Sequence, residues 1–351
     1  MTPGFGALTI GLAAASMAVS AGGVWASIRF AHRAGMIDVP NERSSHAVPT
    51  PRMGGVPMVA AAVLIFACWA YLAAGEVLSI KGLPYAMLFA LGMSILGFWD
   101  DVSGLSPLFR FVVQIAAAAL TLWACSALLP KATLAGWTLP AAAWVPAGAF
   151  WVVWMLNLYN FMDGIDGLAG GEAAVASCFF FLVFAHYGET GWAAANLFIA
   201  AASMGFLVHN WPPARVFMGD AGSSFLGAFY GMQSVAAALT TSVPFPVLVL
   251  PFVNFILDTT FTLFRRMWRK EKWYQPHRSH FYQRMTNLGM SHAKVTGLEL
   301  ASVMVSCLAA VLVLTSSFIW KIVAVAVVSA VFISAGVLVS RNENPQKQGR
   351  S

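Results

Sequence analysis

Charge is scarce in this sequence. Only 10% of its 351 residues are Asp, Glu, Lys or Arg, whereas 59% are hydrophobic and the mean hydropathy is +0.73. Soluble domains average about 25% charged and about 45–50% apolar residues, so the composition excludes an ordinary soluble domain and indicates an integral membrane protein. The net charge of +6 does not imply a nucleic-acid partner, because basic residues of membrane proteins set orientation and contact anionic headgroups.

Three further patterns are absent. No stretch alternates as a transmembrane β-strand does, so the membrane spans are predicted to be helices. The phosphate-binding motif GxxxxGK[ST] does not occur, which excludes a Walker-type nucleotide loop. The few cysteines lie singly in apolar stretches, which excludes a disulfide framework or a cysteine metal site and favours small buried side chains; they are Cys68, Cys125, Cys178 and Cys307.

Apolar runs near 20 residues, long enough to cross about 30 Å of hydrocarbon, predict an all-α integral membrane protein with about eleven transmembrane helices. The predicted spans are 4–28, 55–74, 84–99, 107–129, 144–160, 172–187, 192–209, 221–240, 244–264, 295–315 and 317–340. We expect them to form one polytopic catalytic domain over residues 1–340. The polar residues 341–351 are predicted to be a disordered cytoplasmic tail.

The basic residues predict the orientation of these spans. All but three of the 20 Lys and Arg lie in the odd-numbered loops, at their helix ends or in the tail; the exceptions are Lys81, Lys131 and Lys321. The positive-inside rule therefore places the odd loops and the C-terminus in the cytoplasm and the N-terminus in the periplasm. Clusters of acidic residues fall in the same odd loops, which predicts an active site on the cytoplasmic loops.

The first loop, residues 38–57, combines turn residues with possible anion ligands. Arg43, His46, Thr50 and Arg52 could bind a headgroup or a phosphate, and Gly54-Gly55 permits close backbone approach. A loop that only sets orientation remains an equal alternative.

The third loop carries the adjacent carboxylates Asp100 and Asp101. Two such neighbours repel, so both stay ionised only if they are solvated or bound to a cation. Hard divalent ions prefer oxygen ligands of this kind. A solvated acidic turn is the alternative.

The fifth loop, NLYNFMDGIDGLAGGE, gives a stronger signal. Asn157, Asn160, Asp163 and Asp166 follow one another at three-residue intervals. That spacing lies along one side of a helix end or a tight turn, so we expect the four oxygen-bearing side chains to converge. A metal ion or the polar edge of a ligand is the predicted partner, because the loop contains no Lys or Arg.

The seventh loop reads RVFMGDAGSSFLG and is typical of a turn that leads into a helix N-terminus. The exposed N–H groups of such a terminus favour phosphate, and Asp220 could hold a metal that bridges it. A helix N-cap made by Ser223 or Ser224 is compatible with this reading.

The ninth loop crowds basic and aromatic residues together. His277, Arg278, His280 and Arg284 give it a density of phosphate-binding donors. Interfacial anchoring is the alternative. Asp258 lies before this loop, inside the ninth predicted span, where it could pair with Arg265 or face a watery cavity.

Taken together, these segments resemble a known family. The motifs RSSHxxPTPRxGG, the Asp pair, NxxNxxDGIDGLA, GDxGSxxLG and the His-containing basic loop occur in this order over residues 38–284. They resemble the polyprenyl-phosphate N-acetylhexosamine-1-phosphate transferases, which belong to bacterial glycosyltransferase family 4. The resemblance implies an enzyme of the bacterial cytoplasmic (inner) membrane that moves HexNAc-1-phosphate from a UDP-sugar to undecaprenyl phosphate and releases UMP, with Mg²⁺ or Mn²⁺ as cofactor.

The resemblance also implies roles for individual residues. Asp100, Asp101 and Asp163 are expected to be catalytic or to position the lipid phosphate, with Asp220 and Asn160 as metal ligands. Nucleotide contacts are expected from Asp166, Phe217 and Asn157. Contacts to the diphosphate or the sugar are expected from Arg278, His280, Arg284 and His277, and the floor of the site is expected from Arg43, His46 and Arg52.

The ninth loop also bears on the donor sugar. Its run HRSHFYQR is closer to the branch that starts lipopolysaccharide O-antigen or other surface glycans than to the branch that uses UDP-MurNAc-pentapeptide. The sequence determines neither the sugar nor the oligomeric state, and no motif specifically supports a homodimer.

Two other classes of protein remain as alternatives. A transporter or flippase of lipid-linked sugars would place ionisable groups near the membrane midplane, and a non-enzymatic scaffold would not need the Asn-Asp-Gly cluster. Membrane lipids are expected partners in every case.

Overall fold

The computed structural model describes residues 3–40, 48–73, 82–126, 131–134, 137–272 and 277–315, together with positions 326, 330 and 336. Apart from those three positions, the predicted last span (317–340) and the predicted tail (341–351) lie outside the described residues. Arg43 and His46 of the first loop also lie outside them.

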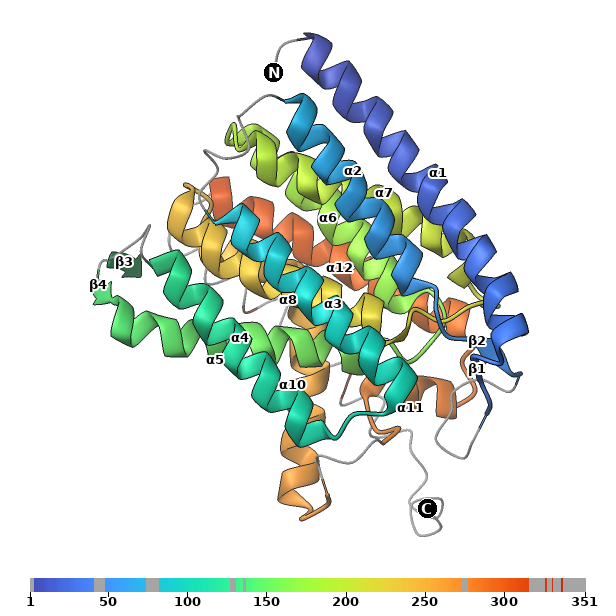
Figure 1. Cartoon of the computed structure of the whole chain (residues 1–351). Coiled ribbons are helices and arrows are strands. Elements are labelled where there is room, and N and C mark those ends of the chain that lie inside the picture. The colour runs from blue at the N-terminus through green and yellow to red at the C-terminus, as the bar shows by residue number, and fades with distance from the viewer. Residues whose placement is uncertain are drawn as a thin grey trace.

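Long helices dominate the described part (Figure 1). They are α1 (Pro3–Ala34), α2 (Gly55–Leu72), α3 (Leu83–Ser103), α4 (Pro107–Ser126), α5 (Ala141–Phe161), α6 (Leu168–His186), α7 (Thr190–Asn210), α8 (Gly219–Thr240), α10 (Val253–Trp268) and α12 (His292–Thr315). Each predicted span from the first to the tenth overlaps one of these helices, and the ninth is broken into several elements. Nine stretches of the described residues are long and apolar enough to cross a membrane, and α8 is not among them.

Short elements interrupt this pattern. The predicted ninth span is divided into α9 (Phe245–Val249), a 3₁₀ turn η1 (Leu250–Phe252) and α10. The break falls at Pro251, because proline cannot continue an α-helix from within. Helix α11 (Phe281–Asn287) follows in the ninth loop. The all-α prediction missed two small antiparallel hairpins, which pair β1 (Ile37–Asp38) with β2 (Thr50–Pro51) and β3 (Lys131–Leu134) with β4 (Trp137–Pro140).

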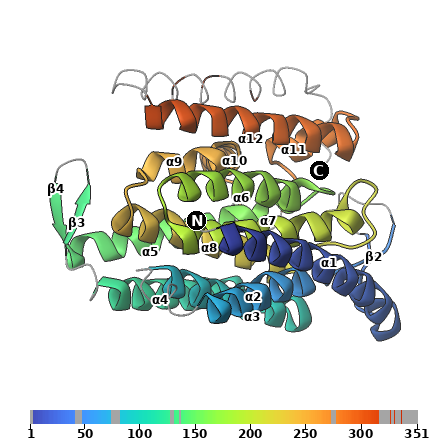
Figure 2. The same ribbon diagram turned by 90° about the horizontal axis from the view of Figure 1, so that it is seen from above.

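Helix α8 runs through the middle of the bundle. Seen from above, α12 covers one side, α2, α3 and α4 cover the opposite side, and α8 lies between them (Figure 2). Small residues allow this close approach: a Cβ on Gly55 of α2 would lie 2.6 Å from the Cα of Gly222, and one on Gly97 of α3 would overlap the carbonyl oxygen of Asp220. Small residues at such contacts are typical of membrane helix packing, and they explain why α8 is less apolar than its neighbours.

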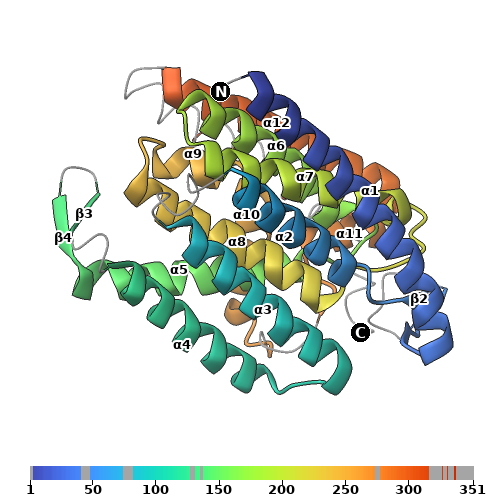
Figure 3. The same ribbon diagram turned by 45° about the horizontal axis from the view of Figure 1, so that its top comes forward.

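The polar segments that were expected to share one compartment do meet at one end of the bundle. Figure 3 shows β2, the C-terminal end of α3 and α11 toward the same end, with the β3–β4 hairpin at the other. Backbone hydrogen bonds join the first and seventh loops, from Phe217 N–H to Pro51 C=O at 2.8 Å and from Gly54 N–H to Phe217 C=O at 2.9 Å. The Tyr282 hydroxyl donates to the carbonyl of Phe161 at 2.9 Å and joins the ninth loop to α5.

All four cysteines are free thiols. Cys125 and Cys307 are buried and Cys178 is half-buried, as expected, but Cys68 is exposed on α2. The prediction that every cysteine is buried was therefore wrong for Cys68, because its side chain lies on the outer face of the helix.

Candidate active site

Two arginines and three aspartates lie together where the first, third and seventh loops meet. Arg52 contacts Asp101, with 3.3 Å between Nε and Oδ1, and Asp220, with 2.8 Å between Nη2 and Oδ1. Burial acts to lower the pKa of Arg52, but nearby carboxylates, led by Asp220 and Asp101, outweigh it and raise the pKa above its ordinary value. Arg52, which was predicted to form part of the site floor, thus lies among the acids of the site.

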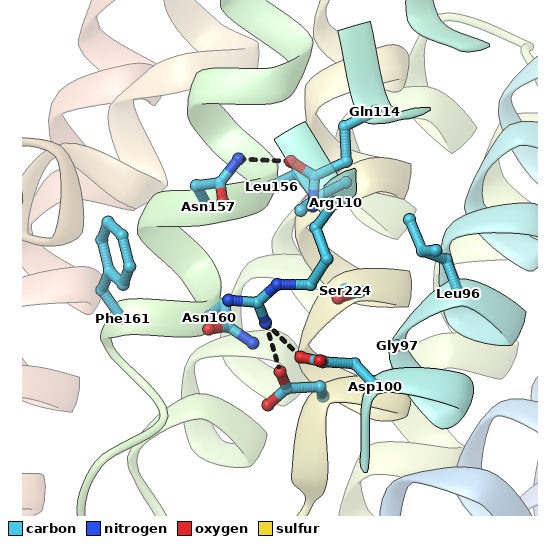
Figure 4. Close-up of a pocket in the computed structure, with 11 residues that line it drawn as sticks. Leu96, Gly97, Asp100, Arg110, Gln114, Leu156, Asn157, Asn160, Phe161 and Ser224 are labelled. Carbon is cyan, nitrogen blue, oxygen red and sulfur yellow. Dashed lines mark hydrogen bonds and ion pairs between the residues drawn. The ribbon is translucent and has the colours of Figure 1, made fainter. Parts of the chain in front are cut away.

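Arg110, near the start of α4, is the second arginine. Its Nη1 atom contacts Asp100 Oδ2 and lies 3.0 Å from Asp220 Oδ2, so that one guanidinium joins two acids of different helices (Figure 4). Sequence analysis did not find this residue. The signal was present, because an arginine in the first turn of an otherwise apolar span is costly unless it has a partner or a function.

Asp101 holds the beginning of α8. Its two carboxylate oxygens accept hydrogen bonds from the backbone N–H groups of Asp220 and Ala221, each at 3.1 Å. An acidic group at this position satisfies unpaired helix N–H groups and favours the helix dipole. The predicted N-cap by Ser223 or Ser224 was wrong, because α8 begins at Gly219 and the Ser223 hydroxyl donates back to the Gly219 carbonyl.

Asp100 has a different partner in the backbone. Its Oδ1 accepts a hydrogen bond from Leu105 N–H at 2.7 Å, across the turn in which Gly104 ends α3 with a left-handed φ of 63°. The two adjacent acids therefore have different roles: Asp101 fixes the start of α8, and Asp100 contacts Arg110.

A small pocket, partly open to solvent, lies beside this cluster. Its walls come from α3, α4, α5 and α8 (Figure 4). The lining residues are Leu96, Gly97, Asp100, Arg110, Gln114, Leu156, Asn157, Asn160, Phe161, Asp220 and Ser224. The Asn157 amide donates to Gln114 Oε1 at 2.8 Å, and the Asn160 amide donates to Ser223 Oγ at 3.0 Å.

The four polar residues of the fifth loop do not converge, and this prediction was wrong. Helix α5 ends at Phe161, so the helical spacing does not continue beyond Asn160. Asn157 and Asn160 face the pocket, whereas Asp163 and Asp166 follow in the turn. Desolvation and the neighbouring Asp220 carboxylate raise the pKa of Asp163 well above its ordinary value, although Arg52 acts in the opposite direction. Asp163 thus belongs electrostatically to the acid cluster.

Asp166 lies in a separate set of contacts. Its Oδ2 accepts a hydrogen bond from Ala214 N–H at 3.0 Å, and its Oδ1 lies 3.2 Å from His292 Nδ1 at the start of α12. Buried Asn210 makes a parallel link, since it accepts from Gly167 N–H and donates to Val216 C=O. Sequence analysis missed both Asn210 and His292, because their partners are distant in the chain.

Asp258 holds the ninth loop in place. It is fully buried, and its carboxylate accepts hydrogen bonds from the backbone N–H groups of Phe281 at 2.9 Å and Tyr282 at 3.2 Å. Its Oδ1 also lies 3.1 Å from His280 Nδ1. The structure therefore gives Asp258 a role that neither prediction, pairing with Arg265 or facing a watery cavity, included: it fixes the N-terminus of α11 and the ring of His280.

The other predicted anion ligands of the ninth loop are partly shielded. The Arg284 guanidinium is buried and lies 5.0 Å from the ring centre of Phe281, while Arg278 is half-buried. Burial, the neighbouring His280 and two arginines lower the pKa of His277 to about 3. The His280 ring lies 6.1 Å from the ring of Phe161, which lines the pocket, so this loop borders the pocket on its α5 side.

The site offers oxygen ligands for a cation but no ready-made metal cage. Within the described residues, no three His, Cys, Asp or Glu side chains form a group that could hold a metal ion by themselves. Asp100 and Asp220 nevertheless present one oxygen each to the same nitrogen of Arg110. Two carboxylates that share one positive partner fit Mg²⁺, which is usually held by one or two carboxylates together with substrate phosphates.

Acids, arginines and an adjoining pocket at the end of a membrane bundle suit the handling of phosphate groups. Arginine recognises phosphate oxygens directly, often through two parallel hydrogen bonds. Carboxylates hold the divalent ion that neutralises a diphosphate. Because the pocket adjoins α4, whose Leu108, Phe111 and Val112 are exposed apolar residues, a phosphate attached to a hydrocarbon chain could reach the arginine.

Comparison with known proteins agrees with this chemistry. Residues 83–238 match the family model described as glycosyl transferase family 4. The chain is 33% identical over 313 residues to a decaprenyl-phosphate N-acetylglucosaminephosphotransferase of Mycolicibacterium smegmatis, which covers 81% of this chain and 76% of that protein. It is 28% identical to a probable undecaprenyl-phosphate N-acetylglucosaminyl 1-phosphate transferase of Bacillus subtilis, over 75% of this chain and 73% of that protein. A phospho-N-acetylmuramoyl-pentapeptide-transferase of Thermosynechococcus vestitus is 34% identical over 51% of this chain and 50% of its own length.

Proposed function

Because the chain belongs to the polyprenyl-phosphate N-acetylhexosamine-1-phosphate transferase family, we propose that it transfers HexNAc-1-phosphate from a UDP-sugar to undecaprenyl phosphate and releases UMP. The acceptor phosphate attacks the phosphorus that carries the sugar, and the bond from that phosphorus to the oxygen of UMP breaks. The product is a lipid-linked diphosphate sugar. The enzyme would act in the bacterial cytoplasmic membrane with its odd loops inside, and would start an O-antigen or another surface glycan.

One observation carries this proposal: Asp220 contacts both Arg52 and Arg110, beside a pocket open to solvent. Two phosphorylated substrates repel each other strongly in a partly dehydrated site. A site that joins them needs cationic groups for the phosphates and acidic groups for a divalent ion. Here both kinds of group come from four different segments of the chain and meet at one point.

The acceptor phosphate fits the pocket beside α4. Arg110 is about one-third exposed and faces that pocket together with Asp100. Its guanidinium could exchange the carboxylate oxygens for phosphate oxygens when the lipid binds. The lipid phosphate is already ionised at neutral pH, so Asp100 and Asp101 would position it or assist the metal rather than act as a strict general base. The apolar outer face of α4 would lie along the polyprenyl chain.

The donor fits the other side of the acid cluster. Asp166 and Phe217 would contact the uracil, while Arg278, His280, Arg284 and His277 would contact the diphosphate or the sugar. Asn157, which was expected to contact the nucleotide, bonds with Gln114 on the pocket side, and we therefore propose it as a contact for the acceptor.

Mg²⁺ or Mn²⁺ held by Asp220 and Asn160, with Asp100 nearby, would neutralise the donor diphosphate and the leaving UMP. Arg52 would hold the Asp220 carboxylate, and Asp163 would lie next to it as a further oxygen-bearing group. With the carboxylates of the cluster partly engaged by such an ion, Arg52 and Arg110 would be available to bind phosphate oxygens.

A flippase or transporter of lipid-linked sugars is the second candidate. The observation that favours it is a buried polar group in the bundle, where Asn254 donates to Glu299 at 3.0 Å and contacts Glu172 at 3.5 Å. Deep ionisable groups of this kind are common in transporters. Asp258, the other deep acid, fixes the ninth loop instead, and the aspartates of the site gather at one end of the bundle.

A direct assay separates the two functions. Purified protein is incubated with undecaprenyl phosphate, Mg²⁺ and, one at a time, UDP-GlcNAc, UDP-GalNAc, UDP-FucNAc and UDP-QuiNAc, and UMP and the lipid product are measured. We expect UMP to appear with at least one donor, and only when both lipid and metal are present. The matched control is Asp220→Ala, which should remain folded and inactive. A folded wild-type protein that releases no UMP with any donor contradicts the proposal.

A further inference from the structure

Gln114 is a polar residue inside an otherwise apolar membrane helix. It lies in the second turn of α4, between Val113 and Ile115, and is only 6% exposed. Polar groups within a membrane segment are costly, so they pair with a partner or serve a function. The hydrogen bond from Asn157 satisfies the oxygen of the Gln114 side chain and leaves its nitrogen to be explained.

The hydrogen bonds of Asn157 determine which end of the Gln114 amide faces the pocket. The side-chain nitrogen of Asn157 donates to the backbone carbonyl of Val153 at 2.8 Å and to Gln114 Oε1 at 2.8 Å. Because a backbone carbonyl only accepts, the nitrogen of Asn157 and not its oxygen must lie there, and both of its hydrogens are used. Gln114 therefore turns its oxygen toward Asn157, and its nitrogen keeps two hydrogens for another partner.

The Gln114 nitrogen has no hydrogen-bond partner among the residues that the structure describes. Gln114 and Arg110 both line the pocket, and because they are four residues apart they lie on the same face of α4. Figure 4 shows both side chains reaching from α4 toward α5, with the oxygen of Gln114 directed to Asn157. The α4 wall of the pocket thus carries one charged and one neutral hydrogen-bond donor.

A purely structural link between α4 and α5 is the competing interpretation, since side-chain amides join neighbouring membrane helices. Such a link needs only the Gln114 oxygen and would not need the nitrogen beside a pocket that solvent can enter. A neutral donor also suits this position. A second cation there would pair with the carboxylates of Asp100 and Asp220, whereas an amide forms no ion pair and stays available to a phosphate oxygen.

We propose that Gln114 binds an oxygen of the acceptor phosphate through its side-chain nitrogen, next to the guanidinium of Arg110. This inference rests on the proposed function for the identity of the acceptor. A hydrogen bond to an ionised oxygen is stronger than one between neutral groups. Gln114 therefore favours a polyprenyl chain that ends in a phosphate over the same chain that ends in a hydroxyl group.

Gln114→Glu separates the two interpretations. Its carboxylate still accepts the hydrogen bond from Asn157, so the link between α4 and α5 is kept, but an anionic oxygen that repels phosphate replaces the donor. Gln114→Met keeps the length of the side chain and removes both polar ends. Thr121→Val, which removes a hydroxyl group bonded to the Ala117 carbonyl of the same helix, is the matched control. Should Gln114→Glu fail to fold, Gln114→Asn, which withdraws the amide by one methylene group, takes its place.

Each variant is assayed for the KM of undecaprenyl phosphate, the KM of the UDP-sugar and kcat, with thermal unfolding in detergent as the measure of folding. We expect Gln114→Glu and Gln114→Met to raise the KM of the lipid about tenfold or more, the usual size for losing a hydrogen bond to a charged group. The KM of the UDP-sugar should change less than about twofold, and Thr121→Val should match the wild type. A wild-type lipid KM in folded Gln114→Glu overturns the proposal, as does an equal rise in both KM values.

Lipid binding without the donor keeps the test independent of turnover. Purified wild type and Gln114→Met are titrated with undecaprenyl phosphate and with undecaprenol. The preference for the phosphate should shrink about tenfold in the variant, whereas general loosening of the bundle would weaken the binding of both lipids alike. An unchanged preference overturns the proposal. A wild type that prefers the phosphate through Gln114 but releases no UMP contradicts the proposed function and leaves the role of Gln114 standing.

Discussion

The Asp101 carboxylate accepts the backbone N–H of Asp220 at 3.1 Å, so that one acid of the site supports the helix that carries another. Asp101 belongs to α3 and Asp220 to α8. Position and charge are thus coupled: a change at Asp101 alters where Asp220 stands as well as the charge around it.

Asp101→Asn tests this coupling. The amide oxygen can accept one of the two N–H groups of α8, but the amide carries no charge for the helix N-terminus or for Arg52. We expect a loss of about 1 kcal/mol in unfolding free energy, the usual size for a weakened cap, and a loss of transfer of at least about 100-fold. Thermal unfolding in detergent and UMP release measure the two effects, and an unchanged unfolding temperature contradicts the supporting role.

Arg110→Gln tests the arginine that sequence analysis missed. Without the guanidinium, the carboxylates of Asp100 and Asp220 face each other with no cation on the α4 side, and the acceptor phosphate loses its partner. We expect the KM of undecaprenyl phosphate to rise about tenfold or more, with a smaller change in the KM of the UDP-sugar. Arg215→Ala, which removes an exposed arginine of the seventh loop, is the control. If the KM of the UDP-sugar rose more than the KM of undecaprenyl phosphate, the assignment of Arg110 to the acceptor would be wrong.

Gly97→Ala tests the contact between α3 and α8. The added methyl group would overlap the carbonyl oxygen of Asp220, and neither helix can move without displacing the acids. Overpacking of this kind costs about 1–3 kcal/mol, so both the unfolding temperature and the transfer rate should fall. Gly92→Ala on the same helix meets no atom within 4 Å and should leave both quantities near wild type. Equal behaviour of the two alanine variants would be inconsistent with this packing.

Glu299→Gln tests the buried acid pair. Glu172 and Glu299 share the amide of Asn254, and Glu172 Oε1 has no hydrogen-bond partner. Two carboxyl groups this close in a buried site cannot both ionise without a large cost, so a neutral side chain of the same size at position 299 should raise the unfolding temperature by a few degrees. Transfer should continue, because the pair lies outside the pocket. A lower unfolding temperature in Glu299→Gln contradicts this interpretation.

His277 predicts how stability depends on pH. Its pKa falls from 6.5 to about 3 in the folded protein, so the unfolded chain binds a proton more readily and stability decreases as the pH falls below 6.5. If His277 were fully buried, this shift would lower the unfolding free energy by about 2 kcal/mol at pH 5. Because the side chain is partly exposed, we expect a loss of about 1 kcal/mol. His277→Gln should therefore lose less stability than wild type between pH 7 and pH 5. Thermal unfolding across this range measures the difference, with His32→Gln at an exposed position of α1 as control; parallel curves would contradict the prediction.

Much of the candidate site was predictable because its signals are local. Asp100-Asp101, Asn160 and the Gly219-Asp220 turn stand out as polar residues between apolar runs, and the structure brings them together. Arg110 and His292 were not found in this way, although the arginine in the first turn of an apolar span was itself a local signal. Each is a single polar residue at the start of an apolar helix, and its meaning depends on a partner more than 100 residues away, Asp220 for Arg110 and Asp166 for His292.

The sequence by itself determined that the chain is a membrane bundle with its chemistry at one end, because hydrophobic run length and the positions of polar loops are properties of contiguous residues. Only the tertiary structure decided which polar residues share a pocket. It separated Asn157 from Asp166 where α5 stops at Phe161, and it showed that Asp258 supports the start of α11. These outcomes depend on how the helices pack and where they end. Small residues at helix contacts, such as Gly97 and Gly222, control that packing, and no local sequence pattern shows which helices they bring together.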